Sequence, residues 1–198
     1  MGRRQTIDRN AVLDAAEAVI REKGINSLTI EAVARAGGIS KGGVQYCFGS
    51  RDAMIRAMID RWEAEFDGEV AAMPENDGTV AGQVRAHVAA TAQSGLASAD
   101  RAAVMLAALS MSAGQRAEAR TWYTARLREI AASGVDAGAL RLAFLATEGV
   151  FLLRSFGLVD MDDAEWDAIF RDIAATAAAH DGAGTKTAAA DDGAGAKT

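Results

Sequence analysis

The sequence has almost no proline, one cysteine and two histidines, and each scarcity excludes a class of protein. Pro74 is the only proline among 198 residues, and together with abundant alanine this favours an all-α fold. A lone cysteine, Cys47, excludes an internal disulfide framework and suits a reducing compartment, so we expect a cytoplasmic protein. The N-terminal residues Met-Gly-Arg-Arg-Gln-Thr do not resemble a signal peptide, and no apolar run is long enough to span a bilayer.

Side chains that carry catalysis or hold metals are sparse and scattered. His87 and His180 lie far apart, and no group of His, Cys and carboxylate residues has metal-ligand spacing. The segment 38–43 is not a phosphate-binding loop, because its glycine spacing differs and no strand precedes it. Cys47 is expected to pack on the inner face of a helix, whereas a redox sensor would need exposure and a positive neighbour. The sequence therefore predicts no catalytic residue, metal or cofactor, and a helical enzyme is the least favoured alternative.

Positive charge is scarce overall but concentrated at one end of the chain. The formal net charge is −6, which is unexpected for a nucleic-acid-binding protein. Residues 1–51 hold eight Lys/Arg and five Asp/Glu. Residues 52–198 hold the remaining thirteen Lys/Arg and twenty-two Asp/Glu. A basic segment of +3 followed by an acidic one of −9 is the asymmetry expected if only the first approaches phosphates.

The stretch from Thr29 to Phe48 has the pattern of a helix-turn-helix. Thr29 is a suitable N-cap for a first short helix, and Gly37-Gly38 end it because glycine tolerates positive φ. Ser40 caps a second helix, on which the apolar face recurs at three- and four-residue spacing. Small and apolar residues fall where two crossing helices touch: Ala34, Gly38, Ile39 and Val44.

This packing leaves Lys41, Gly42, Gln45 and Tyr46 on the outer face of the second helix. Beside an arginine-rich arm, such a face is suited to enter a DNA major groove. A DNA-independent helical adaptor is the alternative, but its interaction helix would carry apolar anchors outward instead. Arg3 and Arg4, in a segment expected to be disordered, would reach phosphates or a minor groove, although a solvated terminus is an equally good interpretation.

Amphipathic helices are expected on both sides of this motif. One runs over Asp8–Lys23, and a longer one starts at Arg51, where the guanidinium and the helix N-terminus would meet a DNA phosphate. Beyond the break at Pro74–Gly78, helical segments are expected at about 79–94, 99–113, 115–133, 136–157 and 163–180. The fold class is therefore all-α, with a three-helix N-terminal head on a C-terminal helical bundle and about nine helices.

The segment 136–157 is apolar nearly all round, so it must be buried on more than one side. We expect a partner subunit to cover its second side, as part of a four-helix interface in a homodimer. Glu148 and Arg154 on this segment are expected to form ion pairs at that interface. The predicted interface residues are Leu140, Phe151, Arg154, Trp166 and Phe170.

Large side chains of the body helices are candidates to line an apolar ligand pocket with few polar groups. Each of them is individually more typical of ordinary core. Methionines in the pocket would suit an apolar ligand of variable shape, because their side chains adapt to it. The candidates are Trp62, Phe66, His87, Met105, Met111, Trp122, Tyr123, Phe144 and Phe151.

The C-terminal residues are of low complexity. Asp181–Thr187 nearly repeats as Asp192–Thr198 and lacks apolar bulk, so we expect a disordered tail, with a partner-binding tail as the alternative. The expected division is a DNA-binding domain over residues 1–50, a ligand-binding and dimerisation domain over residues 51–180, and a tail over residues 181–198.

At these motifs the chain resembles the TetR family of bacterial transcriptional regulators. The resemblance is carried by Leu28-Thr-Ile-Glu-Ala-Val-Ala-Arg-Ala-Gly-Gly-Ile-Ser-Lys-Gly-Gly-Val-Gln-Tyr-Cys-Phe-Gly-Ser-Arg-Asp-Ala-Met-Ile55 and extends back through Leu13-Asp-Ala-Ala16 and Gly24. The remainder is similar only in the number and order of helices. The chain departs from the family pattern at four positions. The family commonly has Phe where this chain has Ile20, and His or Tyr where it has Cys47. It commonly has Pro at the position of Gly49 and Lys at that of Arg51.

The resemblance implies a homodimer that binds a palindromic operator through its N-terminal heads. It also implies that a small-molecule inducer enters the C-terminal body and releases the DNA, as expected of a repressor. Ser40, Lys41, Gly42 and Gly43 would open the recognition helix, and Gln45 would touch bases or phosphate. Phosphate contacts are implied for Thr29, Tyr46 and Arg51.

Overall fold

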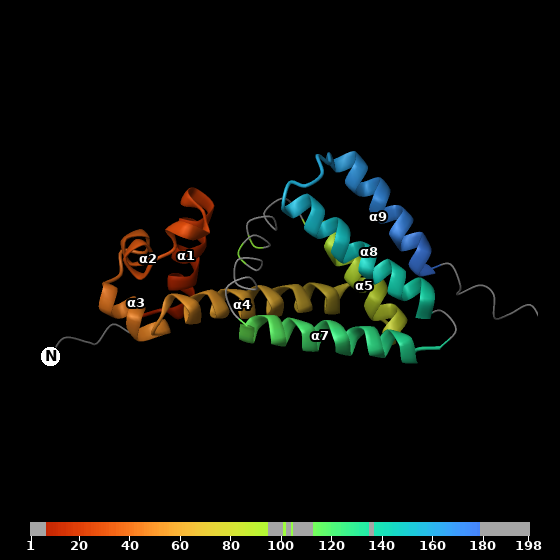
Figure 1. The fold of residues 1–198 in the computed structure, drawn as a ribbon, viewed down its shortest axis with the longest axis horizontal. Helices are drawn as coiled ribbons and strands as arrows, with labels where there is room; N and C mark the ends of the chain where they lie inside the picture. Colours follow the sequence, from red (N-terminus) through yellow and green to blue (C-terminus); the bar gives the residue numbers. More distant parts are fainter. Residues whose placement is uncertain (1–6, 95–100, 102–103, 105–112, 135–136, 179–198) are drawn as a thin grey trace, which may run out of the picture.

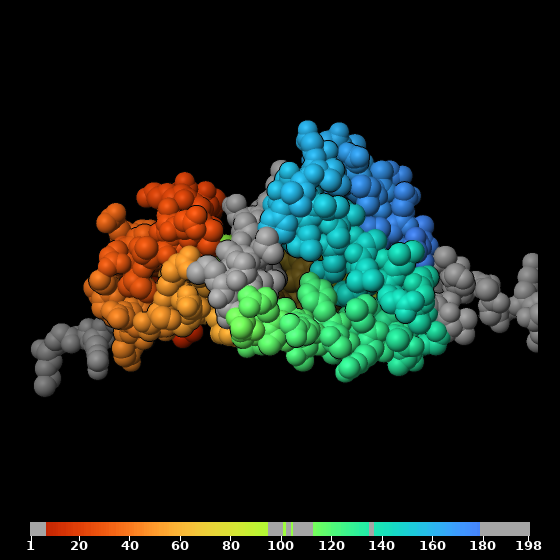
Figure 2. Space-filling model, in the orientation of Figure 1, coloured from red at the N-terminus to blue at the C-terminus, as the bar shows by residue number. Residues whose placement is uncertain are grey.

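The computed structural model describes residues 7–94, 101, 104, 113–134 and 137–178, and within them the chain is all-helical. A small head at one end is joined to a bundle at the other by one long helix, α4 (Figure 1). The space-filling view shows a hollow between α7 and α8, with α4 at its base (Figure 2). Several predictions concern residues outside the described ranges: Arg3, Arg4, Met105, Met111, most of the expected helix 99–113 and the tail 181–198.

Three helices form the head, and their ends agree closely with the capping signals. Helix α1 spans Arg9–Lys23, with the Asp8 carboxylate accepting from the Asn10 amide, and a 3₁₀ turn at Ile25–Ser27 follows. Helix α2 spans Ile30–Ala36 and helix α3 spans Lys41–Phe48. The two short helices carry the predicted Thr29 and Ser40 caps, so local sequence alone determines where both begin.

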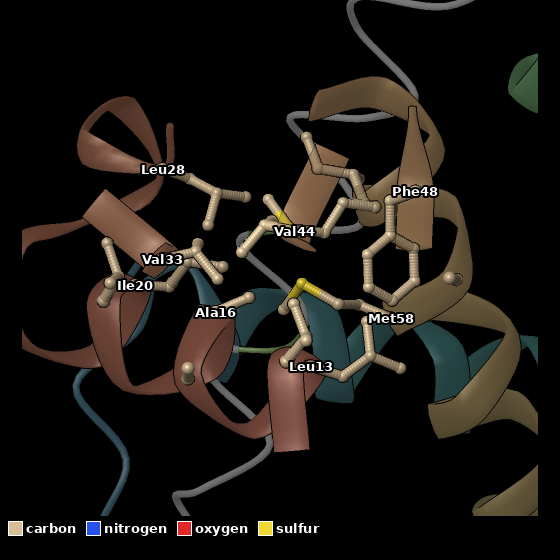
Figure 3. Close-up of a cluster of buried hydrophobic side chains, with 14 of the residues drawn as sticks. Leu13, Ala16, Ile20, Leu28, Val33, Val44, Phe48 and Met58 are labelled. Atoms are coloured by element: carbon tan, nitrogen blue, oxygen red, sulfur yellow. The ribbon is translucent and has the colours of Figure 1, made fainter. Parts of the chain in front are cut away.

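The head core is completed by the first half of α4, which spans Arg51–Ala72. Figure 3 shows Leu13, Val33, Val44, Phe48 and Met58 converging from α1, α2, α3 and α4. A head of about fifty residues has too little apolar volume to be stable alone, so this continuation is expected physically. The head core therefore extends through Trp62 on α4, beyond the expected domain division at residue 50.

Four further helices make the body: α5 (Val80–Gln93), α7 (Ala113–Ala132), α8 (Ala137–Ser155) and α9 (Asp163–Ala178). Helices α5, α8 and α9 pack together, with α7 lying against α8 (Figure 1). Phe144, Ile130 and Leu140 are fully buried at the centre of the body. No helix in the described ranges is long and apolar enough to cross a membrane.

Most of the predicted dimer-interface residues pack in the core of their own subunit, and their role at a dimer interface stays a prediction. Leu140, Trp166 and Phe170 are buried within the body, and Phe151 packs partly buried against the same core. Arg154 bonds to Asp163 in the same chain at 2.6 Å, with its guanidinium 4.5 Å from the centre of the Trp166 ring. The exposed apolar side chains of α8 are different residues: Leu142, Leu145, Leu152 and Leu153.

Candidate nucleic-acid interface and body pocket

The turn between α2 and α3 fixes the angle at which α3 leaves the head. The Ile39 amide donates to the Ala34 carbonyl at 2.9 Å, and the Gly38 amide donates to the Arg35 carbonyl at 3.4 Å. This double closure is a Schellman arrangement, and it requires Gly38 to adopt a φ of +61°. A side chain at Gly38 would therefore strain the turn that orients α3.

Helix α3 has one buried face and one exposed face, divided as the spacing predicts. Val44 and Phe48 lie in the head core, whereas Lys41, Gly42, Gln45 and Tyr46 are exposed. Tyr46 is 84% exposed, which is unusual for a large aromatic residue on a folded helix. The exposed face thus offers an ammonium, an amide and a phenol to a partner outside the chain.

Two adjacent glycines in the first turn of α3 serve different purposes. A Cβ on Gly43 would lie 2.5 Å from the Ile7 side chain and 3.1 Å from that of Ile39, so this residue permits close packing inside the head. A Cβ on Gly42 would meet nothing within 4 Å. Gly42 therefore keeps open space on the outer face, and the fold itself does not require a glycine there.

Lys41 is not a free cation in this structure, a point that the sequence pattern does not reveal. Its ammonium forms an ion pair with the Glu31 carboxylate on α2, and both side chains are largely exposed. The hydrogen bond from Lys41 holds the pKa of Glu31 below its usual range. An approaching phosphate would have to take Lys41 from this carboxylate.

Arg51 also has partners within the protein. Its Nε donates to the Leu28 carbonyl at 2.8 Å, and one Nη donates to the Ile25 carbonyl at 3.1 Å. The guanidinium thereby joins the start of α4 to the turn before α2. This geometry makes Arg51 a residue that positions the head, and its contact with a DNA phosphate stays a prediction.

Arg9 is a cation near α3 that the sequence pattern did not single out. Its guanidinium lies 4.4 Å from the centre of the Phe48 ring and donates to the Cys47 carbonyl at 3.2 Å. Cys47 itself is half-buried against the head core, in keeping with a packing role. Arg9 thus places positive charge at the C-terminal end of the recognition helix candidate.

A polar network connects α1 to α4. Arg61 donates through one Nη to Asp14 at 2.7 Å and through the other to Glu17. The indole of Trp62 donates to the same Glu17 carboxylate at 2.6 Å. The placement of Trp62 in the ligand pocket was therefore wrong: its ring lies in the head core, and its N–H stabilises a carboxylate of α1.

Aromatic side chains from four helices do gather in the body. The His87 ring lies 5.3 Å from that of Phe66 and 5.2 Å from that of Phe144, measured between centroids. Trp122 and Tyr123 lie edge to face at 4.9 Å, and each is 6.2 Å from Phe144. Five of the predicted pocket residues thus form one cluster from α4, α5, α7 and α8.

Glu148 lies within this cluster. One carboxylate oxygen is 2.8 Å from His87 Nε2, and the other accepts from the Tyr123 hydroxyl at 2.7 Å. Burial, Glu148 and Glu63 together raise the pKa of Tyr123. The expectation of an interface ion pair at Glu148 was wrong, because its partners lie 61 and 25 residues away in the same chain.

Glu63, on α4, is the second carboxylate that acts on Tyr123. Partial burial and the neighbouring carboxylates of Asp60, Asp67 and Glu118 raise the pKa of Glu63. Within the described ranges, no group of His, Cys, Asp and Glu residues is arranged to hold a metal ion. The cluster is therefore a mixed aromatic and acidic site.

Comparison with protein families gives two adjacent matches. The family described as bacterial regulatory proteins, tetR family, matches residues 12–58. The family described as tetracyclin repressor-like, C-terminal domain, matches residues 81–178. The comparison with curated proteins gave no match.

Solved structures share the fold at low sequence identity. A TetR-like transcriptional regulator from Rhodococcus sp. RHA1 is 19% identical with a TM-score of 0.62, and the match covers 89% of this chain and 96% of that one. The fatty acid degradation regulator FadR from Bacillus halodurans is 16% identical with a TM-score of 0.63, over 88% and 97% of the two chains. The multidrug binding protein EbrR, complexed with ethidium, is 22% identical with a TM-score of 0.58, over 83% and 96%.

Proposed function

The chain belongs to the TetR family of bacterial regulatory proteins, and from that premise we propose that it is a homodimeric repressor that releases a palindromic operator when a small molecule binds its body. The proposal assigns DNA binding to residues 1–50 and ligand binding and dimerisation to residues 51–180. The observation that carries it is the outer face of α3, where Lys41, Gln45 and Tyr46 are exposed together.

Each side chain on this face has a chemically suitable DNA partner. Gln45 can donate and accept at a base edge in the major groove, which is how amides distinguish adenine. The Tyr46 phenol and the Lys41 ammonium are donors, which suits them to phosphate oxygens. The Thr29 and Ser40 hydroxyls accept from the amides of Ala32 and Gly43, which leaves both O–H groups able to donate to phosphate.

The homodimer is supported by the outer face of α8. Leu142, Leu145, Leu152 and Leu153 recur at the spacing of one helix face and are exposed in the single chain, with Leu142 at 62%. An apolar row of this length is typical of a protein interface. A second copy packed on this row would present two α3 helices about a twofold axis, as a palindromic operator requires.

Ligand control is proposed to act through α4, which contributes to both the head core and the body. Trp62 and Arg61 tie the middle of α4 to α1, and Phe66, one turn later, touches His87 in the aromatic cluster. A ligand that prefers a different position of α4 would change the separation of the two α3 helices. Only such differential affinity can shift the population away from the DNA-binding conformer.

Selection of genomic fragments on the purified protein, followed by fluorescence anisotropy, tests the DNA-binding proposal. We expect a specific palindrome whose affinity falls steeply with salt, because neutralised phosphates release counterions. Tyr46→Ala should weaken binding about tenfold or more, the equivalent of about 1–3 kcal/mol. Lys41→Ala should reduce the slope of log affinity against log salt by about one.

Lys23→Ala is the matched control, because Lys23 is exposed at the end of α1. It should retain the affinity and most of the salt slope of the wild type. Circular dichroism should show all three variants folded, since Tyr46, Lys41 and Lys23 lie outside the cores. If the wild-type protein shows no DNA sequence preference at any salt concentration, the proposal that it is a repressor is refuted.

A further inference from the structure

The electrostatic composition of the aromatic cluster indicates which class of molecule the body binds. Glu148 is mostly buried among rings, and its two described partners are an imidazole and a phenol. A carboxylate has about four lone-pair positions, so these two donors leave acceptor capacity unused. A buried carboxylate is costly unless charge or hydrogen bonds compensate it.

Glu63 increases the negative charge on the same side of Tyr123. The neighbouring charges that raise the pKa of its carboxyl group are those of Asp60, Asp67 and Glu118. Glu63 and Glu148 together outnumber the single imidazole of His87. When both carboxylates are ionised, the site therefore carries a net negative charge.

Three arginines of the surrounding helices bond to other residues. Arg126, whose guanidinium lies 5.9 Å from the centre of the Trp122 ring, donates to Gln83 and Glu129 at 2.9 and 3.2 Å. Arg56 pairs with Glu118, and Arg154 pairs with Asp163. None of these three arginines pairs with Glu63 or Glu148.

The rings around these carboxylates complete a recognisable chemistry. Phe66, Phe144, Trp122 and Tyr123 surround the Glu148 side of the site, and Trp122 and Tyr123 remain partly exposed on α7, the helix that borders the hollow in Figure 2. Ring faces attract organic cations, and the attraction increases when the site is desolvated. A neutral apolar ligand would not balance the negative charge of the two carboxylates, and an anion would be repelled.

We propose that the effector of this regulator is a lipophilic organic cation, held by Glu148 and Glu63 and by the rings of Phe66, Trp122, Tyr123 and Phe144. The inference rests on the proposed function, since it names the class of ligand for the same body pocket. It differs from the small apolar molecule that the sequence suggested. The cation would compensate Glu63 and Glu148 while its apolar surface covers the aromatic rings.

Tetraphenylphosphonium and tetraphenylborate test the proposal, because the two ions have nearly the same size and shape but opposite charge. Isothermal titration of the full chain should show saturable binding of the phosphonium, at least tenfold tighter than that of the borate. Quenching of tryptophan fluorescence should follow the same isotherm, because Trp122 is the exposed tryptophan at the site. Equal or tighter binding of the borate would overturn the inference.

Two charge-removing variants locate the binding. Glu63→Gln and Glu148→Gln should each lower the phosphonium affinity about tenfold and leave the borate affinity unchanged or raised. Glu63 is only partly buried and has no described hydrogen bond, so its variant should fold even if Glu148→Gln does not. Glu165→Gln, which removes an exposed carboxylate from the first turn of α9, is the control and should bind like the wild type.

DNA binding measured on the same samples separates this inference from the proposed function. Release of the operator by the phosphonium but not by the borate supports both. The protein could bind the operator but show no saturable phosphonium binding, or show phosphonium binding that Glu63→Gln does not change. Either result would refute the cationic effector and leave the proposed repressor function intact. Absence of operator binding overturns the repressor itself.

Discussion

Replacement of Arg61 by methionine tests whether α1 and α4 move as one unit. Arg61 is 19% exposed and bonds two carboxylates of α1, of which Asp14 is 70% exposed and Glu17 is 22% exposed. The exposed contact with Asp14 should contribute at most about 1 kcal/mol. The half-buried contact with Glu17 is charge-assisted and should contribute about 1.5–3 kcal/mol.

Three features reduce the sum of these contributions. Arg61 Nε is buried without a hydrogen bond, with a Glu65 carboxylate oxygen 3.9 Å away. After the substitution, Glu17 still accepts from the Trp62 indole at 2.6 Å. Methionine also preserves much of the apolar stem of arginine. We therefore expect Arg61→Met to lower the free energy of unfolding by about 2 kcal/mol.

Urea denaturation at one fixed protein concentration measures this loss, because the stability of a dimer depends on concentration. Glu17→Gln should cost more than Asp14→Asn, and Arg21→Met, which removes an exposed cation from α1, should cost almost nothing. A loss below about 0.5 kcal/mol for Arg61→Met, or equal losses for Glu17→Gln and Asp14→Asn, would refute the reasoning. Ligand control should also weaken in folded Arg61→Met. The ratio of operator affinities without and with ligand should fall towards one.

Four further predictions follow from individual contacts. Gly42→Ala should raise the free energy of unfolding by up to about 1 kcal/mol in a urea titration, because the position is helical and open. The same variant should weaken operator binding in anisotropy measurements. Tighter binding would show that nothing approaches that face. Glu31→Gln should strengthen operator binding, because it frees Lys41 and removes a charge that repels phosphate, and unchanged affinity would contradict the competition. Glu63→Gln should raise the free energy of unfolding at pH 7, because a raised folded-state pKa means that ionised Glu63 destabilises the fold. This gain in stability should vanish as the pH falls below the usual carboxylate range. A gain that persists in acid would contradict this sign. Leu145→Glu should convert a sedimenting dimer into a folded monomer, because Leu145 is exposed in the single chain, and an intact dimer would place the interface elsewhere.

The head could be predicted nearly residue by residue, because its structure depends on local signals. Thr29 and Ser40 cap the helices that follow them, and Gly38 takes the positive φ that ends α2. Each of these signals acts over three or four residues and needs no tertiary partner to be recognised. The exposed position of Tyr46 then follows from the burial of Val44 and Phe48 on the same short helix.

The body could be predicted only as a set of helices. An apolar stripe such as that of α4 does not reveal which of two cores each residue joins, so Trp62 was assigned to the wrong one. A helix that is apolar nearly all round, such as α8, does not show which side faces outward, so its sequence does not reveal that Leu140 is buried and Leu142 is exposed. The partners of Glu148 and Arg51 depend on tertiary contacts that no local pattern contains.

Footprinting of the selected operator tests the central claim most directly, because it locates the outer face of α3 on DNA. The account predicts two protected half-sites related by a twofold axis, with centres about 34–36 Å or a multiple apart, and loss of both in Tyr46→Ala. A single asymmetric footprint, or protection that is unchanged in Tyr46→Ala and Lys41→Ala, would contradict it.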